Sequence, residues 1–409
     1  MKKKHILVIS QYFYPETFRI NDICTEWVKR GYKVTAVTGI PNYPQGKFYD
    51  GYGFFRKRTE HWNGISIIRL PLIPRGKNSL GLAANYLSFV ASGYIWKLFT
   101  RLKADMVFIF EVSPMTQALP GIWYAKKHGV PCAIYVQDLW PENVEIVAGI
   151  NNPAVIRPIE RMVDYIYRSC DHIFATSPSF MREIQKRCRE RKKVSYLPQY
   201  AEDFYQPVER ENAVKLCRVL QLAADRRFKI VFTGNIGKAQ GLGILPGAAA
   251  RLKKSCSGSL LFVIVGDGRC REEFLQQIRR MQAEDMFLMI DRQPAEEIPA
   301  ILGCCDAAFI SFMDNRLFAG TIPAKLQSYM ACRMPVLASA SGETERIVRE
   351  AECGITADIG SEEDLCRAVE KMMSLDRKKL LEMGLNGRRY YEQNFDKGKI
   401  LDQIDLMLW

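Results

Sequence analysis

Short apolar runs alternate with helix-length segments along the whole chain. In the first half the runs have the β-branched and aromatic composition of buried strands, and the segments between them suit helices such as 21–30, which ends at Gly31. This strand–helix–strand order predicts a doubly wound parallel sheet of the α/β class. The predicted strands of this half are 6–10, 33–38, 106–110, 132–136 and 173–176.

The same pattern begins afresh at the run 229–233, which opens a second series of apolar strands. At 409 residues the chain is long enough for two or three domains. We therefore expect two Rossmann-like doubly wound domains, 1–205 and 206–384, that face each other across a cleft. The other predicted strands of the second series are 260–265, 286–290, 307–311 and 335–338.

Two segments raise the question of a membrane. Residues 80–99 are nearly all apolar and approach the length of a membrane span, but Asn85 and Lys97 interrupt them. We expect a helix packed on the sheet, with an exposed aromatic face on a bilayer as the alternative. The basic stretch 182–193 favours a solvated helix face, and contact with anionic lipid headgroups is the alternative.

Positive charge is concentrated in the first half. Residues 1–205 hold 29 Lys and Arg against 17 Asp and Glu, whereas residues 206–409 hold 29 against 28. Such asymmetry indicates an anionic partner for the first half: a membrane surface, a phosphorylated acceptor or nucleic acid. No recognition helix or basic patch with stacking aromatics is evident, which disfavours nucleic acid.

The cysteines and histidines indicate which cellular compartment and which cofactors to expect. The twelve cysteines are scattered without a C-x-x-C pair, and no stretch at the start of the sequence is long enough for a secretory signal. This usage is typical of a reducing cytoplasm, where Cys acts mainly as a small buried hydrophobe. The four histidines form no array with Cys or carboxylates, so we expect neither a metal nor a cofactor.

The most informative chemical feature is the glycine-rich run 232–241 (FTGNIGKAQG), which follows a predicted strand and precedes a helix expected near Leu242. Glycine lets backbone N–H groups come close to a ligand, and the N-terminus of a helix attracts anions. The spacing matches neither the P-loop nor the dinucleotide fingerprint. The run predicts a phosphate cradle, with a plain strand-to-helix turn as the alternative.

Several segments, taken in order along almost the whole chain, resemble family 4 glycosyltransferases of the GT-B fold. The nearest branch is the bacterial colanic-acid and O-antigen group that includes N-acetyl-L-fucosaminyltransferases. The string DLWPE is the most specific of these segments, and the cradle also matches the branch. The segments are YFYPE at 12–16, GYKVT at 31–35, PNYPQG at 41–46, QDLWPE at 137–142, GNIGKAQG at 234–241, VGDG at 265–268 and GTIPAK at 320–325.

This resemblance implies two Rossmann-like domains, with the acceptor at the N-terminal one and a nucleotide-sugar donor at the C-terminal one. It implies a last helix, 385–409, that crosses back to the first domain. The implied reaction is sugar transfer with retention of configuration and without a metal. The donor is expected to be UDP-linked, and the acceptor a polyprenyl-diphosphate-linked sugar at the inner face of the plasma membrane, for surface polysaccharide assembly.

The cradle departs from the family pattern. Related enzymes carry an Arg just after its first glycine and a Lys just before its last, and this chain has Asn235 and Gln240 there. Backbone N–H groups of 234–237, including those of Gly234 and Gly237, would then bind the diphosphate. Lys238 or Lys325 would supply the positive charge. An exposed turn lysine is an equal alternative for Lys238.

The second departure concerns two glutamates, eight residues apart, that mark many relatives. Gly320 and Ser328 stand at those places. At an expected helix start, Gly320 and Thr321 would present backbone donors to the diphosphate. Ser328 would contact the ribose or be an ordinary helix residue. Gly266 belongs to the same donor site, and Arg292, after a predicted strand, would contact the base, with an exposed loop as the alternative.

The remaining candidates lie on the acceptor side. Asp138 follows a predicted strand at its carboxyl end, where open α/β sheets place ligands, and would orient the acceptor hydroxyl or take its proton. Trp140 would stack on a sugar or be buried. Glu16 and Arg19 lie in the first strand-to-helix loop, which in this fold overhangs the donor phosphate. Arg19 is the better phosphate ligand because of its guanidinium fork.

These features favour a glycosyltransferase. A non-hydrolysing nucleotide-sugar epimerase of related fold is the first alternative, because it also binds a nucleotide-sugar but needs no acceptor. A nucleic-acid-binding protein is the remote alternative, suggested only by the basic first half. The expected location is the cytoplasm, peripheral to the membrane.

Overall fold

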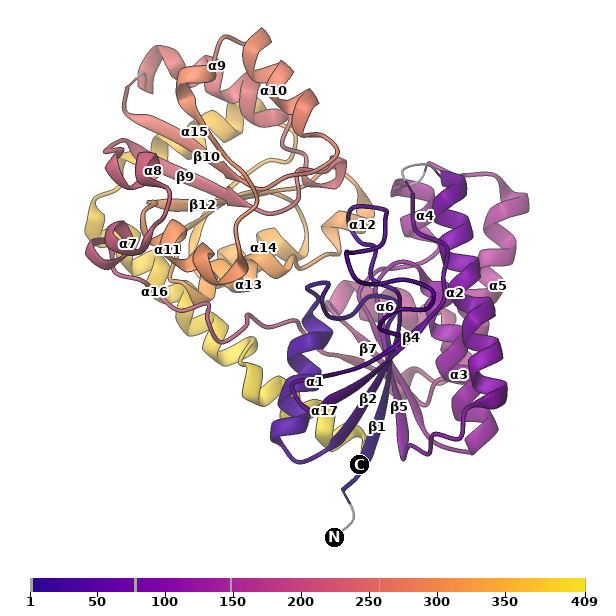
Figure 1. Cartoon of the computed structure of the whole chain (residues 1–409). Helices are drawn as coiled ribbons and strands as arrows, with labels where there is room; N and C mark the ends of the chain where they lie inside the picture. Colours follow the sequence, from indigo (N-terminus) through magenta and orange to yellow (C-terminus); the bar gives the residue numbers. More distant parts are fainter. Residues whose placement is uncertain (1–2, 77–78, 148, 257, 409) are drawn as a thin grey trace. The chain divides into compact units, whose positions relative to one another are not determined.

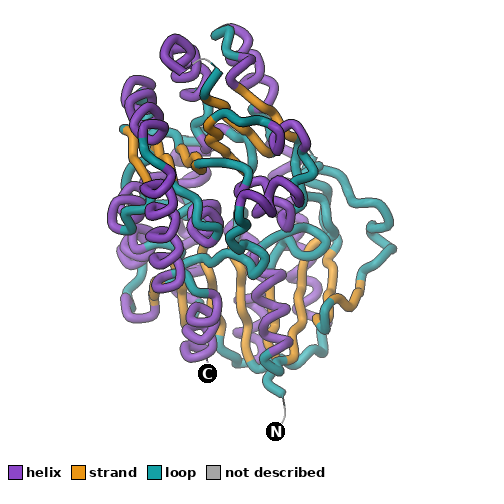
Figure 2. Tube along the Cα trace, turned by 90° about the vertical axis from the view of Figure 1, so that its left-hand side faces the viewer, coloured by secondary structure: helices purple, strands orange, loops and turns teal. Residues whose placement is uncertain are grey.

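A computed structural model describes residues 3–76, 79–147, 149–256 and 258–408, and its helices and strands are labelled in Figure 1. The chain divides into two compact units. The first comprises Met1–Leu197 with Leu401–Trp409, and the second comprises Pro198–Ile400. Each unit has its own sheet with helices packed on it, which is the α/β architecture expected from the sequence (Figure 2).

The first unit is built on an eight-stranded sheet with the order β3-β4-β2-β1-β5-β6-β7-β8. All its pairs are parallel except β3–β4. The central strands β1, β5 and β6 are buried along their whole length, which places the core of the unit at the middle of the sheet. The strands are β1 His5–Ile9, β2 Lys33–Gly39, β3 Thr59–Trp62, β4 Ile65–Leu70, β5 Met106–Glu111, β6 Cys132–Val136, β7 His172–Ala175 and β8 Val194–Tyr196.

Helices cover both faces of this sheet, and α2, α3 and α5 lie side by side on one of them (Figure 1). Among the described residues, no helix has both the length and the apolar character needed to cross a membrane. The helices are α1 Arg19–Lys29, α2 Ser79–Phe99, α3 Ala118–His128, α4 Glu142–Val147, α5 Pro153–Ser169 and α6 Pro178–Arg187, with short 3-10 turns η1 Met115–Gln117 and η2 Arg191–Lys193.

The second unit is built on a six-stranded parallel sheet with the order β11-β10-β9-β12-β13-β14. Its core packs the buried faces of these strands against α9 and α15. The strands are β9 Phe228–Thr233, β10 Leu260–Val265, β11 Phe287–Ile290, β12 Ala307–Ser311, β13 Val336–Ser339 and β14 Gly354–Ala357.

The helices of the second unit include η3, a short 3-10 turn inside the glycine-rich run. Pro323 directly precedes α13, which supplies a lysine to that run. The helices are α7 Arg210–Leu216, α8 Leu220–Ala224, η3 Lys238–Gln240, α9 Ile244–Cys256, α10 Arg271–Arg280, η4 Glu284–Met286, η5 Ala295–Glu297, α11 Ile298–Gly303, α12 Arg316–Ala319, α13 Ala324–Ala331, α14 Glu343–Glu350, α15 Glu362–Ser374 and α16 Arg377–Asn394.

The expected C-terminal helix is in fact two helices. The chain leaves α16 at Phe395 and begins α17, Lys397–Leu408, where Asp396 accepts a hydrogen bond from the backbone N–H of Lys399 at 2.9 Å. The end of α17 belongs to the first unit, because Asp405 accepts hydrogen bonds from Trp27 (3.1 Å) and Arg30 (2.8 Å). All of α16 belongs to the second unit.

The predicted strands are all present, within one residue at each end. Four strands were missed: β3, β4, β8 and β14. The β3–β4 hairpin turns at Asn63 and Gly64, both at positive φ (46° and 78°), which is the Asn-Gly turn that a hairpin favours. The basic stretch 182–193 is only partly helical, because α6 ends at Arg187.

Candidate functional site

The cradle forms where two loops of the second unit meet backbone to backbone. The N–H of Gly234 donates to Val265 O at 2.9 Å, and both Gly234 and Gly266 have φ near +140° (139° and 146°). A Cβ on Gly266 would lie 1.9 Å from Gly234 O. Only glycine fits here, because a side chain would separate the loops and the backbone conformation is one that L-residues rarely adopt.

The next turn of the run is fixed in the same way. Ile236 donates its N–H to Asp267 O at 2.9 Å and accepts a hydrogen bond from the N–H of Cys270 at 3.0 Å. The expectation that all the N–H groups of 234–237 face a ligand is therefore wrong for Gly234 and Ile236. Within the described part of the chain, the N–H groups of Asn235 and Gly237 have no protein acceptor, and they are the cradle's free donors.

Lys325, from the first turn of α13, supplies the cradle's positive charge. Its Nζ donates a hydrogen bond to Gln240 Oε1 and lies 3.9 Å from the centroid of the Phe232 ring. The same Nζ lies 3.7 Å from the point that a Cβ on Gly234 would occupy. Desolvation by these neighbours lowers the pKa of Lys325 to about 7, so an anion placed here would restore the charged form.

Gln240 therefore orients Lys325, a lysine from α13, whereas the family pattern has a lysine at the position of Gln240 itself. Its backbone is held too, because Ser311 Oγ donates to Gln240 O at 2.6 Å and Met313 N donates to Ala239 O at 3.1 Å. The run ends at Gly241 (φ 59°), where a Cβ would lie 2.6 Å from Phe312 O. Lys238, by contrast, is exposed on η3, as expected of a turn lysine.

The expected helix start at Gly320 is wrong. Gly320 caps the end of α12, and its N–H donates to Arg316 O and Leu317 O, at 3.3 and 3.2 Å, so it is not free for a ligand. The N–H of Thr321 is likewise used, on Phe318 O at 3.1 Å. Helix α13 begins only after Pro323, because a residue that precedes proline avoids the helical conformation.

Two further donor-site candidates belong to the same unit but have different surroundings. Ser328 is buried in α13, and its hydroxyl donates to Ala324 O at 3.2 Å, which is the bond of an ordinary helix serine. Arg292 is exposed in the loop after β11. A hollow of about 250 Å³ lies at the end of the glycine-rich run, and its lining residues include Gly241, Phe312 and Met313.

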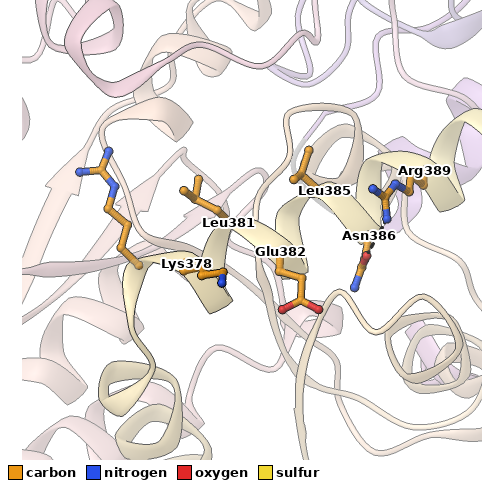
Figure 3. A pocket seen from close by; sticks show the side chains of 7 residues that line it. Lys378, Leu381, Glu382, Leu385, Asn386 and Arg389 are labelled. Atoms are coloured by element: carbon orange, nitrogen blue, oxygen red, sulfur yellow. Dashed lines mark hydrogen bonds between the residues drawn. The ribbon is translucent and has the colours of Figure 1, made fainter.

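A larger hollow than this one, of about 520 Å³, lies elsewhere (Figure 3). All of its lining side chains come from one face of α16, including Lys378, Leu381 and Leu385. It contains none of the candidate site residues. Size alone therefore does not identify the functional site.

In the first unit, Asp138 lies beside a second carboxyl group that the sequence analysis did not single out. Glu111, the last residue of β5, has no exposed surface, and its Oε2 accepts a weak hydrogen bond from the N–H of Asp138 at 3.4 Å. Burial and the charge of Asp138 raise the pKa of Glu111 well above its usual value, and burial also raises the pKa of Asp138. Glu111 directly follows a buried strand, which is the signal that could have found it.

Ser113 connects this carboxyl pair to the DLWPE segment. Its N–H donates to Asp138 Oδ2 at 2.7 Å, while its Oγ accepts hydrogen bonds from Trp140 Nε1 (3.2 Å) and Asn143 Nδ2 (2.8 Å). Trp140 is buried, so it positions this loop and does not offer a face to a sugar. The N–H of Ser113 thus fixes one oxygen of Asp138, Oδ2.

Glu16 and Arg19 have separate roles. Glu16 is buried, and its Oε1 accepts hydrogen bonds from the N–H groups of Asn42 (2.7 Å) and Tyr43 (2.6 Å), which fixes the loop after β2. Desolvation raises the pKa of Glu16 to about 7. Arg19 is the first residue of α1. Burial raises the pKa of Tyr135, and the nearby positive charge of Arg19 partly offsets this effect by lowering it.

A polar network at the same sheet edge was missed. Asn85, from α2, accepts a hydrogen bond from Gln11 Nε2 (2.7 Å) and donates to Ile73 O (2.6 Å). Arg75 donates to the hydroxyl of Tyr12 at 3.3 Å and lies over the ring of Tyr43. The sequence marked Asn85 only as a break in an apolar segment, whereas it anchors the loops that follow β1 and β4.

Comparison with known proteins identifies both units. Residues 17–199 match the family model "Glycosyl transferase 4-like domain", and residues 219–390 match "Glycosyl transferases group 1". WcaI of Escherichia coli K12, described as a colanic acid biosynthesis glycosyl transferase, is 26% identical over 417 residues, and the match covers 98% of each chain.

Solved structures share the fold at low identity. The glycosyltransferase WaaG, of lipopolysaccharide biosynthesis, superposes with a TM-score of 0.70 at 15% identity, over 99% of each chain. HepE of Anabaena, whose structure holds UDP and glucose, gives 0.72 at 16% identity over 99% of each chain. Sucrose-phosphate synthase of Thermosynechococcus elongatus gives 0.76 at 16% identity, over 99% of this chain and 98% of that one. The GT-B fold expected from the sequence is thereby confirmed.

Proposed function

The chain belongs to the group 1 glycosyltransferases, and on that premise we propose that it transfers a sugar, with retention of configuration, from a UDP-sugar to a lipid-linked glycan acceptor. The transfer is a step of surface polysaccharide assembly at the inner face of the plasma membrane. Resemblance to WcaI and WaaG supports the polysaccharide context. The UDP bound to HepE supports the choice of nucleotide.

The observation that carries the proposal is the placement of Lys325 Nζ in the glycine cradle, held by Gln240 and next to Gly234. Cleavage of the bond between the anomeric carbon and the diphosphate develops negative charge on the leaving group. Preorganised positive charge and N–H donors stabilise that charge without having to reorganise. Lys325 and the free N–H groups of Asn235 and Gly237 supply both, so no metal is needed for this step.

On the acceptor side, we assign Asp138 to the acceptor hydroxyl. Its Oδ2 is fixed by the N–H of Ser113, so its remaining oxygen can accept the hydroxyl's hydrogen bond in a set direction. Burial makes this carboxylate more basic than a free aspartate, which strengthens the hydrogen bond and favours proton acceptance. Glu111 is too deeply buried to contact the acceptor. It helps to position Asp138 by accepting a hydrogen bond from the backbone N–H of Asp138.

The test is a turnover assay with a panel of UDP-, GDP- and dTDP-sugars and polyprenyl-diphosphate-linked acceptors. We expect nucleoside diphosphate release that needs both substrates, and a glycosidic bond of the donor's own configuration. Product formation from a UDP-sugar alone would support an epimerase instead. Lack of turnover with every pair would refute the proposal.

A further inference from the structure

Helix α2 turns an apolar face to solvent. Its most exposed large side chains recur at the spacing of one helix face: Leu80, Leu87, Tyr94, Ile95, Leu98 and Phe99. Leu80 is 81% exposed, Leu87 65% and Ile95 57%. We call these six residues the α2 stripe. A surface helix normally presents its polar face to water, so a continuous apolar stripe indicates an interaction site.

Contacts on the opposite face of α2 prevent the helix from rotating to bury the stripe. Asn85 and Phe89 are buried, and Asn85 is hydrogen-bonded to Gln11 and Ile73. Gly93 lies so close to α3 that a Cβ there would be 2.3 Å from Pro120 Cγ. The helix is therefore fixed to its own unit with the stripe outward.

The surroundings of the stripe are basic and aromatic. Residues 71–104 contain no Asp or Glu. At the C-terminal end of α2, Lys127 donates to Lys97 O (2.8 Å) and Leu98 O (3.0 Å), and Trp123 packs edge-on against Tyr94. Arg101 and Lys103 follow, both exposed.

The neighbouring helix α5 extends this charge. Its Arg157, Arg161 and Arg168 are exposed, whereas its acids Glu160 and Asp164 lie within 3.6 and 3.3 Å of Arg187. Helices α2, α3 and α5 lie side by side (Figure 1), so the exposed arginines of α5 add positive charge near the α2 stripe.

We propose that the α2 stripe inserts into the interface of an anionic bilayer, with α2 lying in the membrane plane and the basic groups of α2, α3 and α5 on lipid headgroups. Apolar side chains bordered by aromatic and cationic ones are what such an interface binds. Each Lys or Arg close to an anionic surface adds attraction. A second copy of the chain fits less well, because a two-fold pairing of this face would bring like charges together.

This inference rests on the proposed function for its biological setting, but its test does not require turnover. The full-length protein is sedimented with vesicles of phosphatidylglycerol and phosphatidylethanolamine, and with phosphatidylcholine vesicles. The triple variant Leu87→Ser, Ile95→Ser and Leu98→Ser tests the stripe. A matched control changes three exposed leucines of the second unit whose exposure is comparable or greater: Leu216→Ser, Leu220→Ser and Leu381→Ser.

We expect the wild type and the control to bind anionic vesicles. The stripe variant should bind roughly a hundredfold less, because three aliphatic side chains that would be about half buried in the bilayer interface are lost. Arg101→Gln with Lys103→Gln should weaken binding to anionic vesicles and leave the weak binding to phosphatidylcholine unchanged. Equal binding by the stripe variant would overturn the proposal. So would wild-type dimers, seen by sedimentation equilibrium without lipid, that the stripe variant loses while neither protein binds vesicles.

Turnover then separates the two proposals. With a short-chain acceptor free in solution, the stripe variant should keep the wild-type rate, and with an acceptor embedded in vesicles it should be slower in proportion to its lost binding. If the stripe variant is also slower on the dissolved acceptor, the stripe does not act through the membrane. If the wild type binds vesicles but transfers no sugar, the proposal that the α2 stripe binds a membrane is supported and the proposed function is refuted.

Discussion

Lys325 offers the sharpest test of the cradle, because its pKa of about 7 lies within the working pH range. If the diphosphate binds only the charged form, its affinity follows the protonated fraction of Lys325. That fraction falls from about nine-tenths at pH 6 to about one-tenth at pH 8, so binding should weaken about tenfold, or about 1.4 kcal/mol. Replacing the ammonium with a neutral group should cost about 1.5–3 kcal/mol at pH 6.

The assay is isothermal titration of UDP into the wild type, Lys325→Arg and Lys325→Gln at pH 6, 7 and 8. UDP's own terminal phosphate ionises near pH ~6, and Lys325→Arg, which stays charged throughout, is the control for that change. The wild type should lose about ten times more affinity between pH 6 and pH 8 than Lys325→Arg does. Lys325→Gln should bind UDP weakly at every pH.

At pH 8 the wild type should also take up close to one proton per UDP bound, measured by repeating the titration in buffers of different ionisation enthalpy. Identical pH profiles for the wild type and Lys325→Arg would refute the reasoning. So would a Lys325→Gln variant that binds UDP as tightly as the wild type.

Three further predictions follow from the geometry. Gly266→Ala should destabilise the second unit by about 3 kcal/mol or more in urea unfolding, because its Cβ would meet Gly234 O at 1.9 Å. Gly360→Ala, with positive φ but open space, should cost clearly less, and equal losses would contradict the close packing of the cradle. Glu111→Gln should stabilise the protein increasingly above pH 4.5, by about 1.4 kcal/mol for each pH unit up to the folded-state pKa of Glu111. The folded wild type must keep a proton that the unfolded chain releases, so a gain that is the same at pH 4 and pH 6.5 would be inconsistent with a protonated Glu111. Glu16→Ala should cost about 2–4 kcal/mol, because it leaves the N–H groups of Asn42 and Tyr43 without an acceptor, while Glu16→Gln should recover most of the loss.

The central strands were predictable because they are buried on both faces and form continuous apolar runs, as in 106–110 and 260–265. The edge strand β3 was not, since it is partly exposed and lacks such a run. The single C-terminal helix was wrong because no glycine or proline marks the break at Phe395. Asp396, which directly precedes the next helix and accepts a hydrogen bond from the N–H of Lys399, is a weaker signal.

The site was predictable as far as its loops, because ligands of open α/β sheets lie at the carboxyl ends of strands. Which groups are free could not be read from the sequence. The N–H groups of Gly234 and Ile236 are consumed by a loop some thirty residues away, and Gln240 holds a lysine from α13. Such pairings depend on tertiary contacts, and the same holds for Glu111 beside Asp138.

The most direct test of the account is a structure of the protein determined with UDP bound. We predict that the diphosphate lies in the cradle, with its terminal phosphate within hydrogen-bond distance of Lys325 Nζ and of the N–H groups of Asn235 and Gly237. A UDP bound away from residues 234–241, or one whose phosphates contact neither Lys325 nor these N–H groups, would contradict the account.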